Sequence, residues 1–187
     1  HPVLVPAWVW AGEIESHYAA LVRASTRSGK KPLTGSDRLP CLNLLVLSGS
    51  RLTRAELDAL APFSFGTADT FDAEETGVPF ELSRLTRSVA RSEAKAAMAA
   101  VHRAQLQNSF SPSKLNISSI YHDLVGMPVL LPVYVGSFRY KDASHRFVIN
   151  GQTGEYVGKI PLSIGKVLTA VGIGLAFTVG LGIWLAW

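Results

Sequence analysis

The 187-residue sequence is poor in cysteine and in charged residues. Its single cysteine, Cys41, excludes an intrachain disulfide and a cysteine-rich zinc site. Charged residues make up 17% of the chain, against roughly 25% in a typical globular domain, and 48% of the residues are hydrophobic. This composition argues against a disordered chain and against an ordinary soluble enzyme with a polar surface.

Motifs of catalysis and nucleotide binding are also missing from the sequence. The five histidines are scattered, and there is no HExxH, GxSxG, Walker A or GxGxxG motif. We therefore predict a protein that is not an enzyme and that holds no metal and no cofactor. An enzymatic alternative stays open, in which His122 or His145 acts together with nearby carboxylates.

What the sequence does have is a long apolar segment at its end. Residues 167–187 include no charged residue, and as a helix they would extend roughly 31 Å, which matches a bilayer core of about 30 Å. Small residues recur there at every fourth position, as in helices that associate within membranes; they are Ala170, Gly174, Thr178, Gly182 and Ala186. We predict a transmembrane helix over 164–187 that packs on a partner helix, with composition alone as the alternative explanation of the small residues.

The flanks of this segment predict its orientation. Lys159 and Lys166 precede the segment, and no charged residue follows it. By the positive-inside rule, residues 1–163 are expected on the cytoplasmic side of the inner membrane, as the domain of a single-pass protein.

Residues 1–163 carry both strand and helix patterns. They predict an α+β domain with a mixed or antiparallel sheet, one long helix and one short helix. Strands are expected at 3–10, 40–47, 129–140, 145–149 and 155–160, and a polar loop is expected over 25–38. Gly12 predicts a hairpin or a bulge after the first strand.

Two local motifs make this prediction more specific. Thr53 and Glu56 have the spacing of a capping box and predict a short helix that ends before Pro62. Near the end of the domain, a tight turn is predicted at Asn150, Gly151 and Gly154. The glycines of this turn do not indicate a phosphate-binding loop, because neither a lysine nor a helix follows them.

A longer helix is predicted over 83–107, which holds no proline or glycine and many alanines. Its basic residues lie three or four positions apart and form what we call the basic stripe: Arg84, Arg87, Arg91 and Lys95. The stripe could contact anionic lipid headgroups or an acidic partner protein, and a merely solvated helix face is the alternative. Nucleic acid is not expected as a partner, because no aromatic residues interleave with the stripe.

The order of these elements resembles a family of bacterial membrane-anchored proteins with a TFIIB-type zinc ribbon, often mislabelled as a primosomal helicase. The resemblance extends over nearly the whole chain and is most specific over 131–163. There it rests on Pro132 and Tyr134, on Tyr140, and on Phe147 followed by the Asn-Gly-Gln-Thr-Gly turn. The family's CxxC pairs are missing, so zinc binding is not carried over. Since the chain begins at His1, we expect it to be processed or trimmed.

The resemblance implies a membrane-tethered adaptor, with partners of the SPFH/flotillin-like or phage-shock type. Together with the residue patterns, it predicts a non-enzymatic scaffold that recruits partner proteins at the bacterial membrane, in contact with lipids and with other membrane proteins. The alternative is an accessory subunit of a larger integral membrane complex, either respiratory or photosynthetic. Such a subunit would be found in fixed stoichiometry with one complex.

Overall fold

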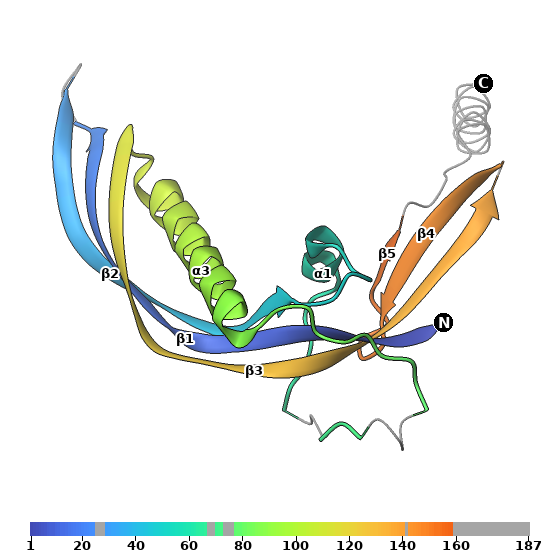
Figure 1. Ribbon diagram of the computed structural model, residues 1–187. Coiled ribbons are helices and arrows are strands. Elements are labelled where there is room, and N and C mark those ends of the chain that lie inside the picture. The colour runs from blue at the N-terminus through green and yellow to red at the C-terminus, as the bar shows by residue number, and fades with distance from the viewer. Residues whose placement is uncertain (25–28, 67–69, 73–76, 141, 159–187) are drawn as a thin grey trace, which may run out of the picture.

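A five-stranded antiparallel sheet forms most of the computed structural model, which describes residues 1–24, 29–66, 70–72, 77–140 and 142–158. The strands are β1 (Pro2–Arg23), β2 (Lys30–Leu47), β3 (Lys114–Tyr140), β4 (Ala143–Asn150) and β5 (Tyr156–Gly158). Their order across the sheet is β2-β1-β3-β4-β5, and every neighbouring pair is antiparallel. Two helices in the described part pack on the sheet, α1 (Arg54–Leu60) and α3 (Arg87–Phe110) (Figure 1).

The three long strands bend near the middle of the sheet, which gives the molecule its curved outline (Figure 1). At the bend, β2 and β3 each hold one extra residue relative to β1, and Asn43 and Asp123 have positive φ values of 56° and 49°. Gly12 of β1 lies there against β3, since a Cβ atom on it would come within 3.0 Å of the His122 carbonyl oxygen. Of the two features predicted at Gly12, a hairpin or a bulge, the structure has the bulge: the pairing register shifts there, and β1 continues through Gly12.

The bend divides the sheet into two parts. We call the part that contains β4, β5 and residues 2–10 of β1 the base, and the part that contains residues 13–23 of β1 the arm. In the base, β1 is covered on both faces, because alternate residues of a strand point to opposite sides. One face packs against α1 and the segment after it, through Val3, Val5, Ala7 and Val9; the other holds Trp10, which packs near Ala90 and Ala94 of α3.

In the arm, only one face of the sheet is covered, and α3 covers it (Figure 1). Ile14, Ser16, Ala20 and Val22 are buried on that face, whereas Glu13 and His17 lie on the other. The helix contributes one row of buried residues four positions apart: Ala90, Ala94, Met98, His102 and Leu106. Its small alanines let the helix backbone lie close to the sheet.

The two predicted helices are present. For α1 the capping box is confirmed: Thr53 Oγ1 accepts from the Glu56 amide at 3.2 Å, and Glu56 accepts from the Thr53 amide at 2.8 Å. The longer helix begins at Arg87 rather than at residue 83. Val89 and Val101 are 45% and 53% exposed, because the row from Ala90 to Leu106 faces the sheet instead.

The first four predicted strands were too short, and the predicted loop over 25–38 is wrong from residue 30 onward. Lys30 to Arg38 belong to β2 and pair with β1. Pro32 and Gly35 suggested a loop, but β2 is an edge strand, where a missing ladder hydrogen bond is tolerated. The tight turn at Asn150 is confirmed, and it joins β4 to β5.

The predicted fold class is wrong in its balance of sheet and helix, and the predicted membrane-spanning helix has no support in the described part of the chain. The prediction gave an α+β domain of residues 1–163 followed by a membrane-spanning helix; the described chain is mainly one five-stranded antiparallel sheet, in which three strands are long. Among the described residues, no helix is both long and apolar enough to cross a membrane, so the single-pass description is not supported. The segment 164–187 and its row of small residues, Ala170, Gly174, Thr178, Gly182 and Ala186, lie outside the described residues.

Candidate functional site

A cavity of about 600 Å³ lies at the bend, where the start of α3 meets the sheet. It is lined by Trp10 of β1, Leu124 of β3, and Arg87, Ser88 and Arg91 of the first turns of α3. Trp10 directly precedes the bend in β1, and Leu124 directly follows the bulged residue of β3. The same irregularity that bends the sheet therefore positions both apolar walls of the cavity.

The start of α3 is held in place by the segment that leads into it. The Ser48 carbonyl accepts from the Arg84 amide at 2.8 Å, and its hydroxyl accepts from the Leu85 amide at 3.1 Å. Thr86 is the N-cap residue, but its side chain caps no backbone amide and instead contacts the Ser88 hydroxyl at 3.1 Å. The helix also has no acidic residue in its first turn. Its N-terminal amides therefore keep their positive potential beside the cavity.

Trp10 forms the buried wall of the cavity. Its side chain is 1% exposed, and its ring lies against Gly126, where a Cβ atom would come within 2.4 Å of the indole. It stacks on Trp8, with ring centroids 5.9 Å apart. The Nε1 groups of both tryptophans are buried without a hydrogen-bond partner in the described structure. Such orphaned donors are rare in folded proteins, and each calls for an explanation.

The four residues of the predicted basic stripe fall into two pairs in the structure. Arg87 and Arg91 are exposed and both line the cavity. Arg84 precedes the helix and lies 3.6 Å from Glu81, and the Lys95 ammonium lies 5.1 Å from the centroid of the Tyr121 ring. Two of the four basic residues therefore converge on one site, while the other two are engaged elsewhere.

The predicted turn residues serve to join elements of the base. Asn150 is 1% exposed, and its side-chain amide donates to the carbonyls of Leu60 at 2.9 Å and Pro62 at 3.2 Å. The Gly151 amide donates to the Pro132 carbonyl, and Gly154 has a φ of 78°, which favours glycine. The turn thus attaches β4 and β5 to the end of α1 and lies away from the cavity.

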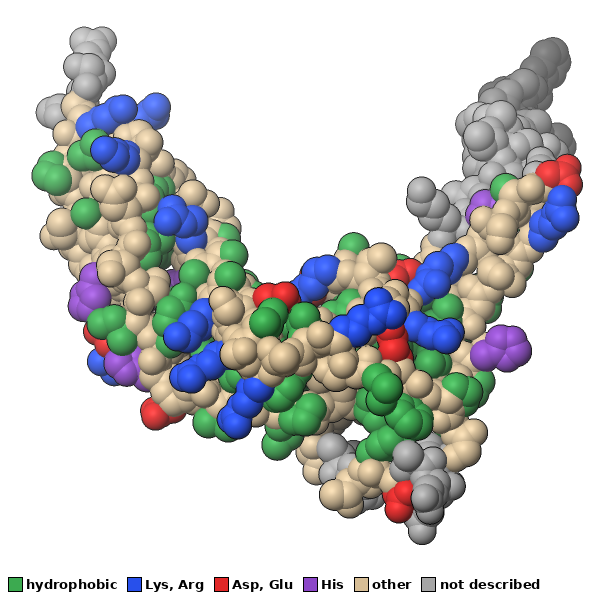
Figure 2. Space-filling model, in the orientation of Figure 1, with side chains coloured by type: hydrophobic (Ala, Val, Ile, Leu, Met, Phe, Trp, Pro, Cys, Tyr) green, Lys and Arg blue, Asp and Glu red, His purple; other side chains and the backbone are tan. Residues whose placement is uncertain are grey.

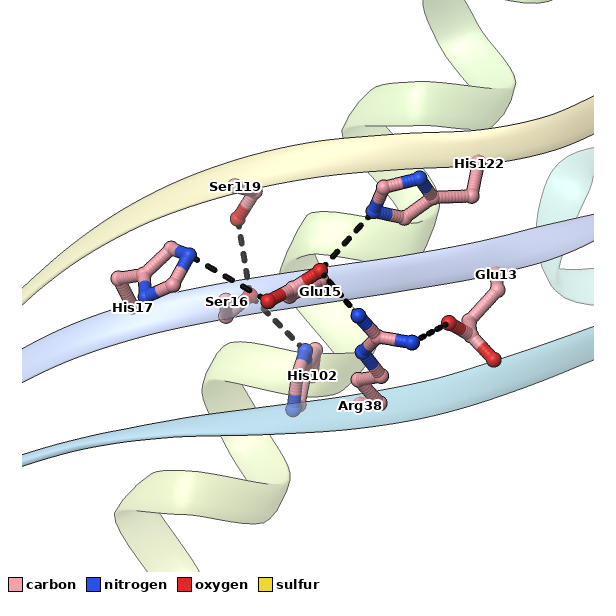
Figure 3. Close-up of polar contacts among 8 residues, drawn as sticks. All are labelled: Glu13, Glu15, Ser16, His17, Arg38, His102, Ser119 and His122. Atoms are coloured by element: carbon pink, nitrogen blue, oxygen red, sulfur yellow. Dashed lines mark hydrogen bonds and ion pairs between the residues drawn. The ribbon is translucent and has the colours of Figure 1, made fainter.

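A second polar cluster, which the sequence analysis missed, lies between α3 and the arm (Figure 3). His102 Nδ1 is 2.9 Å from Ser16 Oγ, and His102 Nε2 is 3.0 Å from Asp37 Oδ2. Serine, histidine and aspartate in one chain of hydrogen bonds are the residue types of a hydrolase triad. Here Ser16 is fully buried and His102 is 1% exposed, so a substrate cannot reach the hydroxyl. The arrangement holds the helix on the sheet.

A third cluster lies on the uncovered face of the arm (Figure 3). Glu15 accepts from Arg38 and from His122, each at 3.0 Å, and His17 lies 3.5 Å away. Burial raises the pKa of Glu15, but the hydrogen bond from His122 and the charges of Arg38 and His17 outweigh burial and hold the pKa below its ordinary value of 4.5. No group of three metal-ligating side chains in metal-binding geometry occurs in the described part of the chain.

The two histidines of the enzymatic alternative, His122 and His145, contact different groups in different parts of the sheet. His122 does contact a carboxylate, that of Glu15, but on an open sheet face. His145 stacks on Phe138, with ring centroids 5.3 Å apart. The cavity at the bend contains neither histidine among its lining residues.

Comparison with known proteins adds one short match. No family model matches the chain, and no solved structure matches it. A stretch of 52 residues, 28% of this chain, is 50% identical to the uncharacterized protein YdjG of Bacillus subtilis (strain 168). That stretch covers 13% of the YdjG protein, so the similarity is confined to a small part of both chains.

Proposed function

We propose that the protein is a non-enzymatic adaptor that recruits a partner protein by binding an acidic segment of it in the cavity at the bend. The observation that carries this proposal is the pair Arg87 and Arg91. Both guanidinium groups are exposed at the cavity, and neither has a carboxylate partner among the described residues.

The position of the two arginines favours an acidic ligand. They lie four positions apart, so they project from the same face of α3. The positive end of the helix lies beside them, and the net charge of the chain is +4. Carboxylates accept hydrogen bonds from guanidinium groups with matching planar geometry.

The apolar walls favour a protein segment over a small free anion. Trp10 and Leu124 line the same cavity as the arginines. Figure 2 shows hydrophobic and basic side chains interleaved over one face of the molecule, from the tip of the arm to the base. Aromatic and arginine side chains together are the usual anchors of protein interfaces.

Fluorescence anisotropy with labelled peptides tests the proposal. Peptides rich in glutamate and containing one aliphatic anchor are expected to bind the 187-residue chain, and a lysine-rich peptide of the same length is not. The double variant Arg87→Glu with Arg91→Glu should lose about tenfold or more in affinity for the acidic peptide, because it replaces attraction by like-charge repulsion.

A second double variant controls for net charge. Arg23→Glu with Arg103→Glu makes the same change in charge at two exposed residues outside the cavity lining. It should keep most of the affinity at physiological salt, where charges more than about 8 Å away are screened. Equal losses in the two double variants, or no binding of acidic peptides at all, would contradict the proposal.

A further inference from the structure

We propose that the acidic segment of the partner binds as an added β-strand along the free edge of β3, between Ile117 and Leu124, so that one end of the segment lies at the cavity. This inference rests on the proposed function and names the way in which the segment is held. The backbone of β3 carries it, whereas the arginines of the cavity carry the proposed function.

The arm leaves one side of β3 without a neighbouring strand. The order across the sheet is β2-β1-β3-β4-β5, but β4 pairs with β3 only from Val133 onward. Among the described residues, no strand pairs with residues 114–131 on the side away from β1. Figure 1 shows this part of β3 at the border of the three-stranded arm. A sheet border of this kind is where an extended peptide can add as a further strand.

The strand register identifies the backbone groups that point to this border. The His1 amine donates to the Val135 carbonyl at 2.9 Å and the Val135 amide donates to the His1 carbonyl at 3.0 Å, so odd-numbered residues of β1 direct their backbone hydrogen bonds to β3. β1 has no extra residue at the bend, so this alternation continues into the arm, where odd-numbered residues of β1 pair with even-numbered residues of β3, such as Glu15 with Ile120. The odd-numbered residues of this part of β3 therefore direct their N–H and C=O groups away from β1; they are Ile117, Ser119 and Tyr121.

Side chains mark both ends of the free stretch of β3. At one end, Arg103 Nη1 donates to the Leu115 carbonyl at 3.4 Å, which agrees with the outward direction of the odd-numbered residues and leaves this carbonyl occupied. At the other end, Leu124 lines the cavity. A strand added between these two residues would lead from the arm to the cavity.

The two borders of the arm differ in how they resist pairing. β2 carries lysines, an arginine and prolines along its border: Lys30, Lys31, Pro32, Arg38 and Pro40. Charges and prolines on an edge strand are the usual means of preventing a further strand from adding. Residues 115–121 of β3 include neither a charged residue nor a proline. The sheet is therefore protected on one border and left open on the other.

The charges beside the open border favour an acidic strand. The Lys95 ammonium lies 5.1 Å from the centroid of the Tyr121 ring, and the Tyr121 hydroxyl donates to the Lys95 carbonyl at 3.0 Å. Glu93, the one acidic residue of α3, and Lys95 flank Ala94 of the buried row, so the helix places them on opposite sides of that row. A second copy of this chain would bring another Lys95 to the border and meet like-charge repulsion, whereas an acidic strand is attracted.

The two faces of the border predict the pattern of the added segment. Successive side chains of a strand point to opposite faces of a sheet. On the face that α3 covers they would meet Lys95 and, near the cavity, Arg91. On the uncovered face they would meet Ile120, which is 47% exposed. The segment that fits therefore alternates acidic residues with aliphatic ones.

Amide hydrogen exchange followed by NMR tests the inference on the 187-residue chain. In the free chain, the outward amides of Ile117, Ser119 and Tyr121 should exchange rapidly. The amides of Ser118 and Ile120 point to β1, so they should be protected and serve as the internal control. At saturation, a peptide in which glutamate and valine alternate should slow exchange of the three outward amides by at least about tenfold, because each gains an acceptor, and should change the control amides little.

Methylation of the peptide backbone provides a matched pair of ligands. Alternate residues of an added strand direct their N–H groups to β3, and the residues between them direct theirs to water. N-methylation of every second residue should therefore weaken binding by at least about tenfold in one of the two sets, and by less than about threefold in the other.

A variant of β3 removes one of the outward donors. Ile117→Pro lacks an N–H that no described strand of the free chain uses, and edge strands accept proline at such positions. It should weaken binding of the alternating peptide about tenfold, whereas Ile117→Ala, which keeps the N–H, should weaken it by less than about threefold. Thermal melting shows whether both variants are folded; if Ile117→Pro is not, the exchange and methylation experiments decide.

The outcomes separate this inference from the proposed function. If acidic peptides bind but exchange of the three outward amides does not change, or if the two methylated sets bind equally, strand addition is overturned while recruitment of acidic segments stands. If no acidic peptide binds, both fall. Protection of the three outward amides in the free chain, including protection that rises with its concentration because a second copy pairs there, would also overturn the inference.

Discussion

The base and the arm are built from the same three strands, yet they use them differently. In the base, β1 has a core on each face, one with α1 and one around Trp10. In the arm, α3 covers one face and the other carries Glu13, Glu15 and His17. A strand that is covered on both faces has a nearly continuous run of apolar residues in its sequence. In a strand that is covered on one face, apolar and polar residues alternate.

The difference teaches where a binding site can form in such a sheet. The described cavity lies neither within the filled base nor within the regular arm. The cavity lies at their junction, where Trp10 belongs to the last buried position of the base and Arg87 to the helix that covers the arm. The bulges that change the direction of the strands thus create the space that the helix terminus borders.

The largest effect is expected from the core of the base. Leu60 of α1 is fully buried there, and Leu60→Ala should lower the free energy of unfolding by about 2–5 kcal/mol through lost burial and a residual cavity. Urea denaturation measures the change. The matched variant Leu42→Ala, at a side chain that is 76% exposed, should change stability by less than about 0.5 kcal/mol. Similar losses in both would show that the base is not the principal core.

The next largest effect on stability is expected at the junction of the base and the arm. Gly126→Ala would place a Cβ atom within about 2.4 Å of the Trp10 ring, and displacing that ring is expected to cost about 1–3 kcal/mol. Gly66→Ala is the control, because nothing lies within 4 Å of its added Cβ. Thermal unfolding compares the two; a Gly126→Ala variant as stable as Gly66→Ala would contradict the close packing of Trp10 on β3.

The arm should respond to loss of the buried hydrogen bonds that hold α3. Ser16→Ala removes a fully buried hydroxyl and leaves His102 Nδ1 without its 2.9 Å partner, at a cost of about 1 kcal/mol. Hydrogen exchange should show faster exchange in α3 than in β3 and β4 of the base. Ser118→Ala, at an exposed neighbouring position, should leave exchange in α3 unchanged. If Ser118→Ala speeds exchange in α3 as much as Ser16→Ala does, the Ser16–His102 cluster has no special part in holding the helix.

The smallest effect is expected on the uncovered face of the arm, and it depends on pH. The pKa of Glu15 is lower in the folded chain than its ordinary value of 4.5, so the charged form stabilises the fold. This contribution is present above that value and is lost as the pH falls through the lower folded pKa. Glu15→Gln should therefore be less stable than the parent near pH 7, with the difference shrinking below about pH 4.5. A difference that does not change with pH would contradict the ion-pair assignment.

Local motifs in the sequence predicted local structure well. Thr53 and Glu56 predicted the start of α1, and Asn150 with Gly151 predicted the turn between β4 and β5, because each motif satisfies its own backbone within a few residues. The alanine-rich segment predicted α3. These elements depend on contacts between near neighbours in the chain, which a sequence displays directly.

The lengths of the strands could not be predicted from local motifs in the sequence in the same way. Gly12 and Pro32 suggested interruptions, but pairing with neighbouring strands extends β1 and β2 through both. The buried face of α3 could not be predicted from residue type either, because the apolar Val89 and Val101 are exposed, whereas His102 is buried in the row from Ala90 to Leu106. In both cases the deciding contacts come from residues far away in the chain.

The sequence by itself determined the capped short helix, the alanine-rich long helix, the turn at Asn150 and the basic character of the stripe. Only the tertiary structure decided which of the basic residues act together. Arg87 and Arg91 line one cavity with Trp10, although 77 and 81 positions of chain separate them from it, because the bulges bend the sheet just where the helix begins. Residue types are written in the sequence, whereas their convergence depends on the register and curvature of strands that pair over long distances.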